Sequence, residues 1–186
     1  DILAPILISI IAASTPLLFA AIGELVVEKS GVLNLGVEGM MLGGAVIAFI
    51  ISVETGNSSL AIVAGAAMGA MMAGLFAVLT LGLLANQVAT GLALTLFGIG
   101  LSALLGQGYV GTPLTALPKL NISGLTDIPI LGPVVFGQDI LVYLSFVVTA
   151  IVAWFLYRTR AGLILRSVGE NPHAAHAIGF PVIRIR

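Results

Sequence analysis

The sequence predicts an all-α protein, a polytopic transmembrane helical bundle that ends in a short cytoplasmic helix. Of its 186 residues 59% are hydrophobic and 8% are charged, whereas a soluble domain carries roughly 25% charged residues. Five apolar stretches approach or exceed the length that crosses a bilayer. Five of the seven basic residues stand in the last segment, 158–186. A lipid-facing bundle explains so much apolar surface, and a soluble core does not.

The predicted spans lie near residues 2–22, 36–53, 60–85, 88–105 and 140–157. They are expected to be helices, because every backbone polar group in lipid needs a partner within its own segment and no alternating ten-residue strand pattern is present. Pro16 is expected to kink the first span. Segment 106–139 contains four prolines and is interpreted as an external loop with short interfacial pieces.

Orientation follows from the arginines after the last span. Arg158, Arg160 and Arg166 lie within the distance over which basic residues mark the cytoplasmic side. Segment 158–186 is therefore predicted to be cytoplasmic and segment 106–139 external, in a multi-pass membrane protein. Residues 1–186 are interpreted as one transmembrane domain. The start at Asp1 without Met and the stop at Arg186 predict a fragment of a longer protein, which is taken to be an N-terminal one.

The third span contains a row of small residues at four-residue spacing, which includes Gly65, Gly69 and Ala73. Small residues at this spacing let helix backbones approach closely where lipid removes the hydrophobic drive for association. The row is therefore a candidate for helix packing. It fits static packing in a bundle or dimer, and it also fits a helix that moves against or lines a central path.

A glycine-rich stretch, GELVVEKSGVLNLGVEGMM, follows the first span. Gly31, Gly36 and Gly39 surround Asn34 and Glu38, and glycines at membrane depth permit unwound backbone along a cavity. Glu38 inside the membrane would be costly and hence a functional candidate. Alternatively, Glu38 lies in the first turn of an interfacial helix, where the positive end of the helix dipole favours an acid.

The cytoplasmic tail contains signals for a short helix. Asn171 is a good N-cap, Pro172 suits the first helical position, and Gly179 suits the position after the end. These signals predict a helix over Pro172–Ile178, about 10 Å long, and Pro181 is expected to discourage further helix. A short, well-capped helix of this kind is a docking element.

His173 and His176 stand one turn apart within the predicted tail helix. Two histidines at this spacing can bind a metal, with Glu170 as the one further ligand nearby. The alternative is that both are solvated helix residues. With two histidines and no cysteine in the chain, no metal site is predicted.

Two motifs resemble the permease subunits of bacterial ABC importers, in the family for branched-chain amino acids, simple sugars and nucleosides. GELVVEKSGVLNLGVEGMM resembles the region after the first main span of the nucleoside or simple-sugar branch, which works with a lipoprotein binding component. RAGLILRSVGENPHAAHAIGF resembles the family's cytoplasmic loop, in which a short coupling helix docks on the ATP-binding subunit. The resemblance covers essentially the whole chain, and it implies that the chain lies in a bacterial inner membrane.

This resemblance implies roles for two sets of residues. The set that would contact the ATPase is Gly169, Glu170, Asn171, Pro172, Ala175 and Gly179. The set that would lie near the translocation path is Gly31, Asn34, Gly36, Glu38 and Gly39. His173 and His176 depart from the Arg or acidic residues that relatives often have there. The implied partners are ATP-binding cassette subunits, a second identical or different permease subunit, an extracytoplasmic substrate-binding protein or lipoprotein, and membrane lipid.

Missing motifs indicate where the energy for transport enters. The sequence has no P-loop, no HExxH and no Gly-x-Ser-x-Gly, so the chain is predicted not to be an enzyme and to bind no cofactor, with ATP and Mg used by a partner subunit. No nucleic-acid partner is predicted, because the basic residues are not interleaved with aromatics. Transport of a nucleoside or simple sugar is the expectation. The alternative is an ion-coupled secondary transporter, or another stand-alone membrane protein, that uses Glu38.

Overall fold

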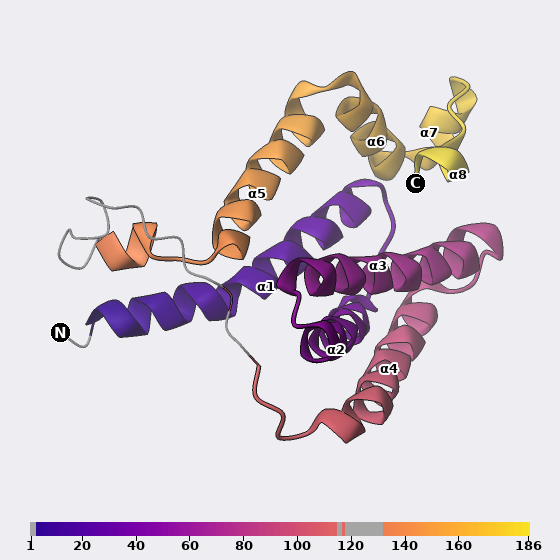
Figure 1. The fold of residues 1–186 in the computed structure, drawn as a ribbon. Helices are drawn as coiled ribbons and strands as arrows, with labels where there is room; N and C mark the ends of the chain where they lie inside the picture. The colour runs from indigo at the N-terminus through magenta and orange to yellow at the C-terminus, as the bar shows by residue number, and fades with distance from the viewer. Residues whose placement is uncertain (1–2, 115–116, 118–131) are drawn as a thin grey trace. The chain divides into compact units, whose positions relative to one another are not determined.

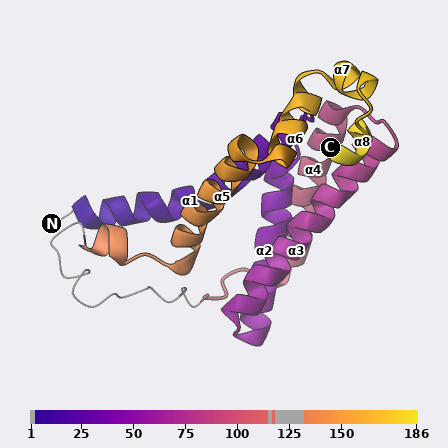
Figure 2. The same cartoon turned by 90° about the horizontal axis from the view of Figure 1, so that it is seen from above.

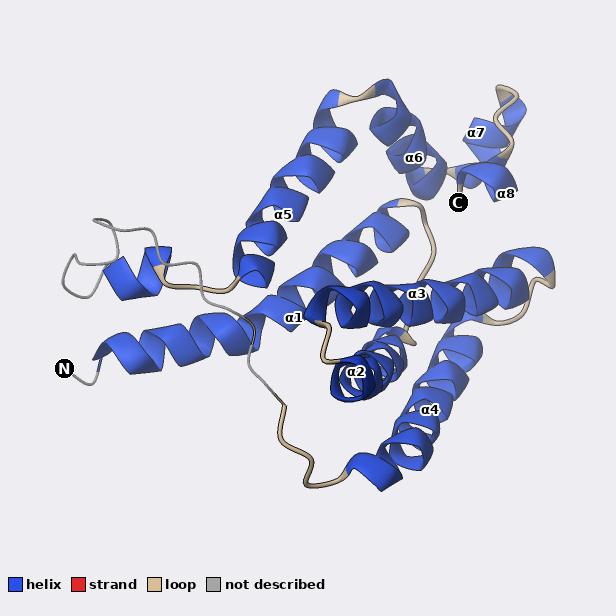
Figure 3. Ribbon diagram, viewed as in Figure 1, coloured by secondary structure: helices blue, strands red, loops and turns tan. Residues whose placement is uncertain are grey.

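The computed structural model describes residues 3–114, 117 and 132–186. It divides into two compact units: unit 1 comprises residues 1–26 with 116–164, and unit 2 comprises residues 27–115 with 165–186. Figure 1 shows the ribbon, and Figure 2 shows it turned by 90°. The described residues form helices joined by turns and loops, with no extended strand (Figure 3). The predicted all-α class is thereby confirmed.

Five helical segments in the described chain are long and apolar enough to span a membrane, as predicted: Leu3–Lys29, Val37–Thr55, Ser58–Gly82, Gln87–Tyr109 and Ile140–Arg158. They correspond to helices α1 (Leu3–Lys29), α2 (Val37–Thr55), α3 (Ser58–Ala77), α4 (Gln87–Gly106) and α5 (Ile140–Arg158). A π-helical turn, Val78–Gly82, extends α3, and a 3₁₀ turn, Gln107–Tyr109, extends α4.

Helix α1 differs from the predicted first span at its end, and the predicted kink at Pro16 stays a prediction. Pro16 lies inside α1 without ending it, and the helix continues past Ile22 to Lys29. The extension GELVVEK contains good helix formers, and Lys29 in the last turn complements the helix dipole. The glycine-rich stretch is therefore unwound only from Ser30 to Gly36.

Polar caps fix where three of the spans begin. The Asn57 side chain accepts hydrogen bonds from the amides of Ser59 and Leu60 at 3.0 and 3.1 Å at the start of α3. Asn86 caps α4 through the Ala89 amide at 3.0 Å, and Asp139 caps α5. Each cap satisfies backbone donors that have no partner in the first helical turn.

Unit 2 is organised around α2, which packs against both α3 and α4 (Figures 1 and 2). Its buried apolar cluster consists of Val32, Met40, Met72, Phe76 and Leu94. Glycines bring the helices close: a Cβ on Gly65 of α3 would lie 2.9 Å from the carbonyl oxygen of Gly44 of α2. Gly69 has nothing within 4 Å of such a Cβ among the described atoms, and Ala73 is exposed.

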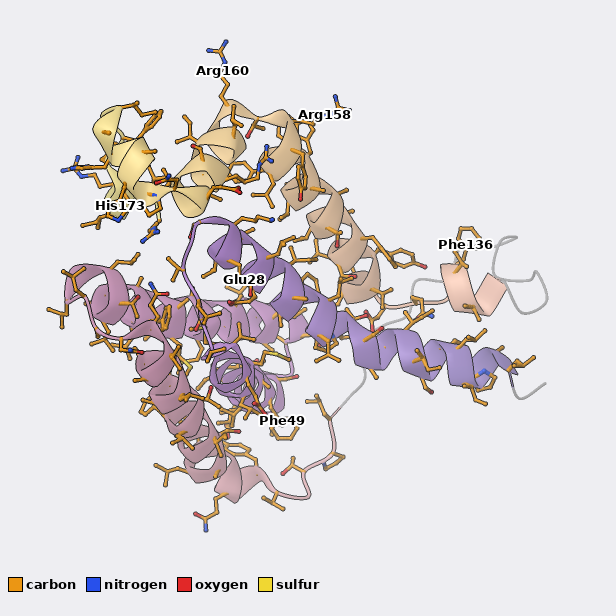
Figure 4. All side chains as sticks on the ribbon, turned by 180° about the vertical axis from the view of Figure 1, so that it is seen from behind. Glu28, Phe49, Phe136, Arg158, Arg160 and His173 are labelled. Atoms are coloured by element: carbon orange, nitrogen blue, oxygen red, sulfur yellow. The ribbon has the colours of Figure 1, made fainter. Side chains whose placement is uncertain are left out.

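Unit 1 contains α1 as far as Val26, α5 and the first residues of α6 (Arg160–Glu170). A π-helical turn, Gly132–Phe136, precedes α5, and most of the predicted external loop lies outside the described residues. The α5–α6 corner is tight, because a Cβ on Gly162 would meet the carbonyl oxygen of Phe155. Arg158 and Arg160 project away from this corner in Figure 4.

The tail contains more helix than expected. α6 is followed by α7 (Pro172–Ala177) and by α8 (Val182–Ile185). The expectation that Pro181 discourages further helix was wrong, because proline is tolerated at a helix start, where a missing amide hydrogen costs nothing. Pro181 is the residue that precedes α8.

Candidate functional site

The short tail helix α7 forms as predicted, with a defined cap at each end. At its start, the Asn171 side-chain oxygen accepts a hydrogen bond from the Ala174 amide at 3.0 Å, and Pro172 takes the first helical position. At its end, Gly179 has φ +93°. The amides of Gly179 and Phe180 donate to the carbonyls of His176 and Ala175 at 3.0 and 3.1 Å, which is a Schellman motif.

The surface of α7 is almost wholly exposed. Ala175 is the buried residue of the helix, with 4% of its surface accessible, whereas His173 and His176 are exposed. Ile178, just after the helix, is 75% exposed. Among the described residues, no group of three or more metal-ligating side chains gathers around the histidines or elsewhere. α7 therefore presents a small, rigid, partly apolar surface.

A single residue joins α7 to α6. The Asn171 amide donates to the Ser167 carbonyl at 3.1 Å, which completes α6, and the Asn171 carbonyl accepts from the Ala175 amide at 3.0 Å. One residue thus belongs to the hydrogen-bond pattern of both helices. Because both bonds constrain the same residue, the direction of α7 is set by the direction of α6.

The structure brings Gly31 and Gly169 together, although the two were predicted for different roles. Gly31 ends α1 in a Schellman motif with φ +81°, in which the amides of Gly31 and Val32 donate to Glu28 and Val27 at 2.9 and 3.3 Å. A Cβ on Gly31 would lie 2.9 Å from the Cα of Gly169. The two backbones therefore touch without a side chain between them.

Asn34 organises the unwound segment from inside. It is 6% exposed; its side-chain oxygen accepts from the Gly36 amide at 2.9 Å, and its side-chain nitrogen lies 3.6 Å from the sulfur of Met40. This arrangement closes the backbone ahead of α2. In this chain Asn34 is a buried structural residue of the segment.

The unwound segment is also fastened to α4. The Gln87 side-chain oxygen accepts from the Leu33 amide at 2.9 Å, and the Thr95 hydroxyl donates to the Leu35 carbonyl at 2.9 Å. Gly91 lies between these two anchors, and a Cβ there would lie 2.8 Å from the Leu35 nitrogen. The segment can approach α4 because that position lacks a side chain.

Gly36 and Gly39 likewise allow the backbone at the start of α2 to approach α4 closely. A Cβ on Gly36 would lie 3.3 Å from the Gly91 carbonyl oxygen, and one on Gly39 would lie 2.5 Å from the carbonyl oxygen of Leu94. From the other side, a Cβ on Gly98 would lie 2.5 Å from the Gly39 Cα. The crossing of α2 and α4 thus depends on glycine at facing positions.

Glu38 lies in the first turn of α2, and its side chain is exposed. An acid at this position interacts favourably with the positive end of the helix dipole. The place of Glu38 in the first turn agrees with the interpretation in which it favours the start of a helix, and its role near a translocation path stays a prediction.

Four residues of α4 belong to this site but were not identified from the sequence: Gln87, Gly91, Thr95 and Gly98. A signal was available, because Gly91, Thr95 and Gly98 follow the i, i+4, i+7 spacing of one helix face. The hydrophobic length of the fourth span predicts a membrane crossing but does not indicate this face. Small and hydroxyl residues on one face of an apolar helix indicate close packing.

The C-terminal end of α4 lies beside a further polar contact and an open cavity. The Tyr109 hydroxyl donates to the carboxylate of Glu54 at 2.7 Å, which ties the end of α2 to the 3₁₀ turn after α4. A cavity of about 650 Å³, open to its surroundings, is lined by Ser102, Ala103, Leu104, Gly106, Gln107 and Val110. Neither feature involves the glycine-rich segment.

Comparison with known proteins identifies a family and several relatives. The model of the family "Branched-chain amino acid transport system / permease component" matches residues 6–186. A protein of Haloferax volcanii, provisionally named a glucose ABC transporter permease, is 41% identical over 95% of this chain and 55% of its own length. No solved structure matches the chain.

Two further relatives are named for nucleosides. A nucleoside ABC transporter permease of Lactococcus lactis is 36% identical over 93% of this chain and 58% of its own length. A guanosine ABC transporter permease of Bacillus subtilis is 32% identical over 100% of this chain and 62% of its own length. The chain therefore spans somewhat more than half the length of the relatives it matches.

Proposed function

Because the chain belongs to the permease-component family of branched-chain amino acid transport systems, we propose that it is the membrane-spanning permease subunit of an ATP-binding cassette importer. It alternates between outward- and inward-facing states, and a separate ATPase subunit supplies the energy. The observation that supports this proposal most directly is helix α7. It is capped at both ends, and Ala175 is its buried residue while most of its surface is exposed. A docked subunit would cover that surface.

The partners and the location follow from the same proposal. ATP-binding cassette subunits dock on Gly169–Gly179, where Glu170 and Asn171 are exposed, and these subunits bind the ATP and Mg. A second permease subunit and an extracytoplasmic binding protein or lipoprotein complete the importer. The chain lies in the inner membrane with the Arg-rich tail on the cytoplasmic side, and it has no catalytic activity or bound cofactor of its own.

The substrate that we propose is a nucleoside or a simple sugar. The support comes from relatives, two of which are named for nucleosides and one for glucose. Gly31, Asn34, Gly36, Glu38 and Gly39 lie near the translocation path in this proposal. The close fit of Gly36 and Gly39 against α4 supports a role in positioning helices beside the path, and the exposed Glu38 is the one acidic side chain of the set.

Docking can be tested by co-purification of the intact permease with its ATPase subunit. Deletion of Pro172–Ile178 removes α7, and Glu170→Arg reverses a charge beside its cap. Both variants are expected to lose the ATPase subunit. The matched control is the charge reversal Glu54→Arg at the C-terminal end of α2, outside the tail. This variant is expected to retain the ATPase subunit. Association that survives the deletion would overturn the proposal that α7 is the docking element.

A further inference from the structure

Two parts of unit 2 that are distant in the sequence are held together by backbone. Gly169, at the end of α6, lies against the turn Lys29–Gly31 that ends α1. A Cβ on Gly169 would meet the carbonyl oxygen of Lys29 and would lie 2.9 Å from the Gly31 nitrogen. Contacts between backbones involve no rotatable side chain, so a shift of one partner displaces the other.

Arg186 makes a second contact with the same turn. Its Nε donates to the Ser30 carbonyl oxygen at 3.0 Å across a sequence separation of 156. Its Nη2 would lie 2.8 Å from a Cβ on Gly31. Ser30 is 3% exposed, and its hydroxyl donates to the Val27 carbonyl at 2.6 Å. The turn that receives Arg186 is therefore itself fixed.

The residues that make these two contacts, Gly169 and Arg186, lie on either side of α7 in the sequence. Gly169 comes just before the cap residue Asn171, and Arg186 follows α8. We call the group Lys29, Ser30, Gly31, Gly169 and Arg186 the tail clasp. Both ends of the segment that contains α7 contact the same turn. Neither end is free to absorb a displacement of α7.

The turn leads directly into the unwound segment that is anchored on α4. Gln87 and Thr95 hold Leu33 and Leu35 there, at 2.9 Å each. α2 begins immediately afterwards at Val37. A continuous set of short contacts therefore runs from α7 through the tail clasp to the ends of α2 and α4.

We propose that the tail clasp is the mechanical link that passes the movement of α7 to the start of α2 and to α4, with Gly31, Gly169 and Arg186 as positioning residues. This inference rests on the proposed docking of an ATPase subunit on α7. Its distinctive consequence is that docking and coupling can be separated. A damaged clasp leaves the ATPase bound and hydrolysing ATP, while less substrate is moved for each ATP.

The first test compares Gly31→Ala, whose added Cβ would lie 2.9 Å from the Gly169 Cα, and Arg186→Ala in the intact permease, reconstituted in liposomes with its ATPase subunit. The readout is the ratio of nucleoside or sugar taken up to ATP hydrolysed. Both variants are expected to keep the ATPase subunit and to lower this ratio by about tenfold, within the usual range of coupling between sites. The matched control Gly100→Ala, in α4 with nothing within 4 Å of its new Cβ, is expected to leave the ratio unchanged.

The second test needs no substrate. The chain has no cysteine, so spin labels can be placed at Leu33→Cys, ahead of α2, and at Ile178→Cys, beside α7; these residues are 40% and 75% exposed. In the complex with the ATPase subunit, the distance between the labels is expected to stay the same on trapping ATP with vanadate. In Gly31→Ala, which changes the clasp outside the docking segment, the distance is expected to change.

The outcomes separate this inference from the proposed function. An unchanged uptake ratio in both clasp variants would overturn the link while leaving the docked importer intact. A label distance that changes in the otherwise unmodified protein would overturn it too, and so would loss of the ATPase subunit from the clasp variants. If the unmodified permease does not bind the ATPase subunit, the proposed function fails and the link fails with it.

Discussion

Replacing Gly98 by alanine should disrupt the crossing of α2 and α4. The added Cβ would meet the Gly39 carbonyl oxygen and would lie 2.5 Å from the Cα and 2.6 Å from the carbonyl carbon of Gly39. Favourable carbon contacts require about 3.5–4.0 Å, so the helices must separate locally by about 1 Å. The obstacle is backbone on the facing helix, so a change of rotamer cannot relieve it.

The expected cost follows from two opposing effects. Overpacking costs about 1–3 kcal/mol, and the better helix propensity of alanine returns about 1 kcal/mol. We expect Gly98→Ala to lower the free energy of unfolding by a net value of up to about 2 kcal/mol, which is the difference between these terms.

The matched control is Gly100→Ala on the same helix, where nothing lies within 4 Å of the new Cβ. This variant should be neutral, or more stable by up to about 1 kcal/mol. The assay is denaturant unfolding of the purified protein in detergent micelles, followed by circular dichroism at the helical signal. Equal unfolding midpoints for the two variants would refute the close crossing at Gly98.

Two further substitutions test separate contacts. Thr95→Val removes the hydroxyl that donates to the Leu35 carbonyl at 2.9 Å and should lower unfolding stability by about 1 kcal/mol; Thr90→Val on the same helix is the control, and equal losses would argue against the anchor. Asn171→Ala removes the cap of α7, which costs about 0.5–2 kcal/mol. The loss should weaken binding of the ATPase subunit by up to about thirtyfold. Asn57→Ala removes the cap of α3 and should leave that binding unchanged, so equal effects of the two cap variants would contradict docking at α7.

The features that the sequence predicted best depend on neighbouring residues. The five spans follow from hydrophobic length, and α7 follows from Asn171, Pro172 and Gly179, which lie within one short segment. Caps of this kind act over a few positions, so their signals can be read locally. The end of α1 was missed because its extension has ordinary helix formers rather than an apolar pattern.

The features that it did not predict depend on residues far apart in the chain. The bonds from Gln87 and Thr95 to the unwound segment join positions 54 and 60 residues apart, and nothing in a single sequence pairs them. Gly169 lies within the last turn of α6, where glycine weakens a helix. The tertiary contact with Lys29–Gly31 explains that residue, and only the structure shows it.

Transport itself tests the central claim most directly. The intact permease would be reconstituted in liposomes with its ATPase subunit and its binding protein, and uptake of labelled nucleosides and simple sugars would be measured. We expect uptake to require ATP, to be unaffected when proton and sodium gradients are collapsed, and to vanish when Pro172–Ile178 is deleted. Uptake that persists without ATP and disappears with an ion gradient would contradict the account and would favour a secondary transporter.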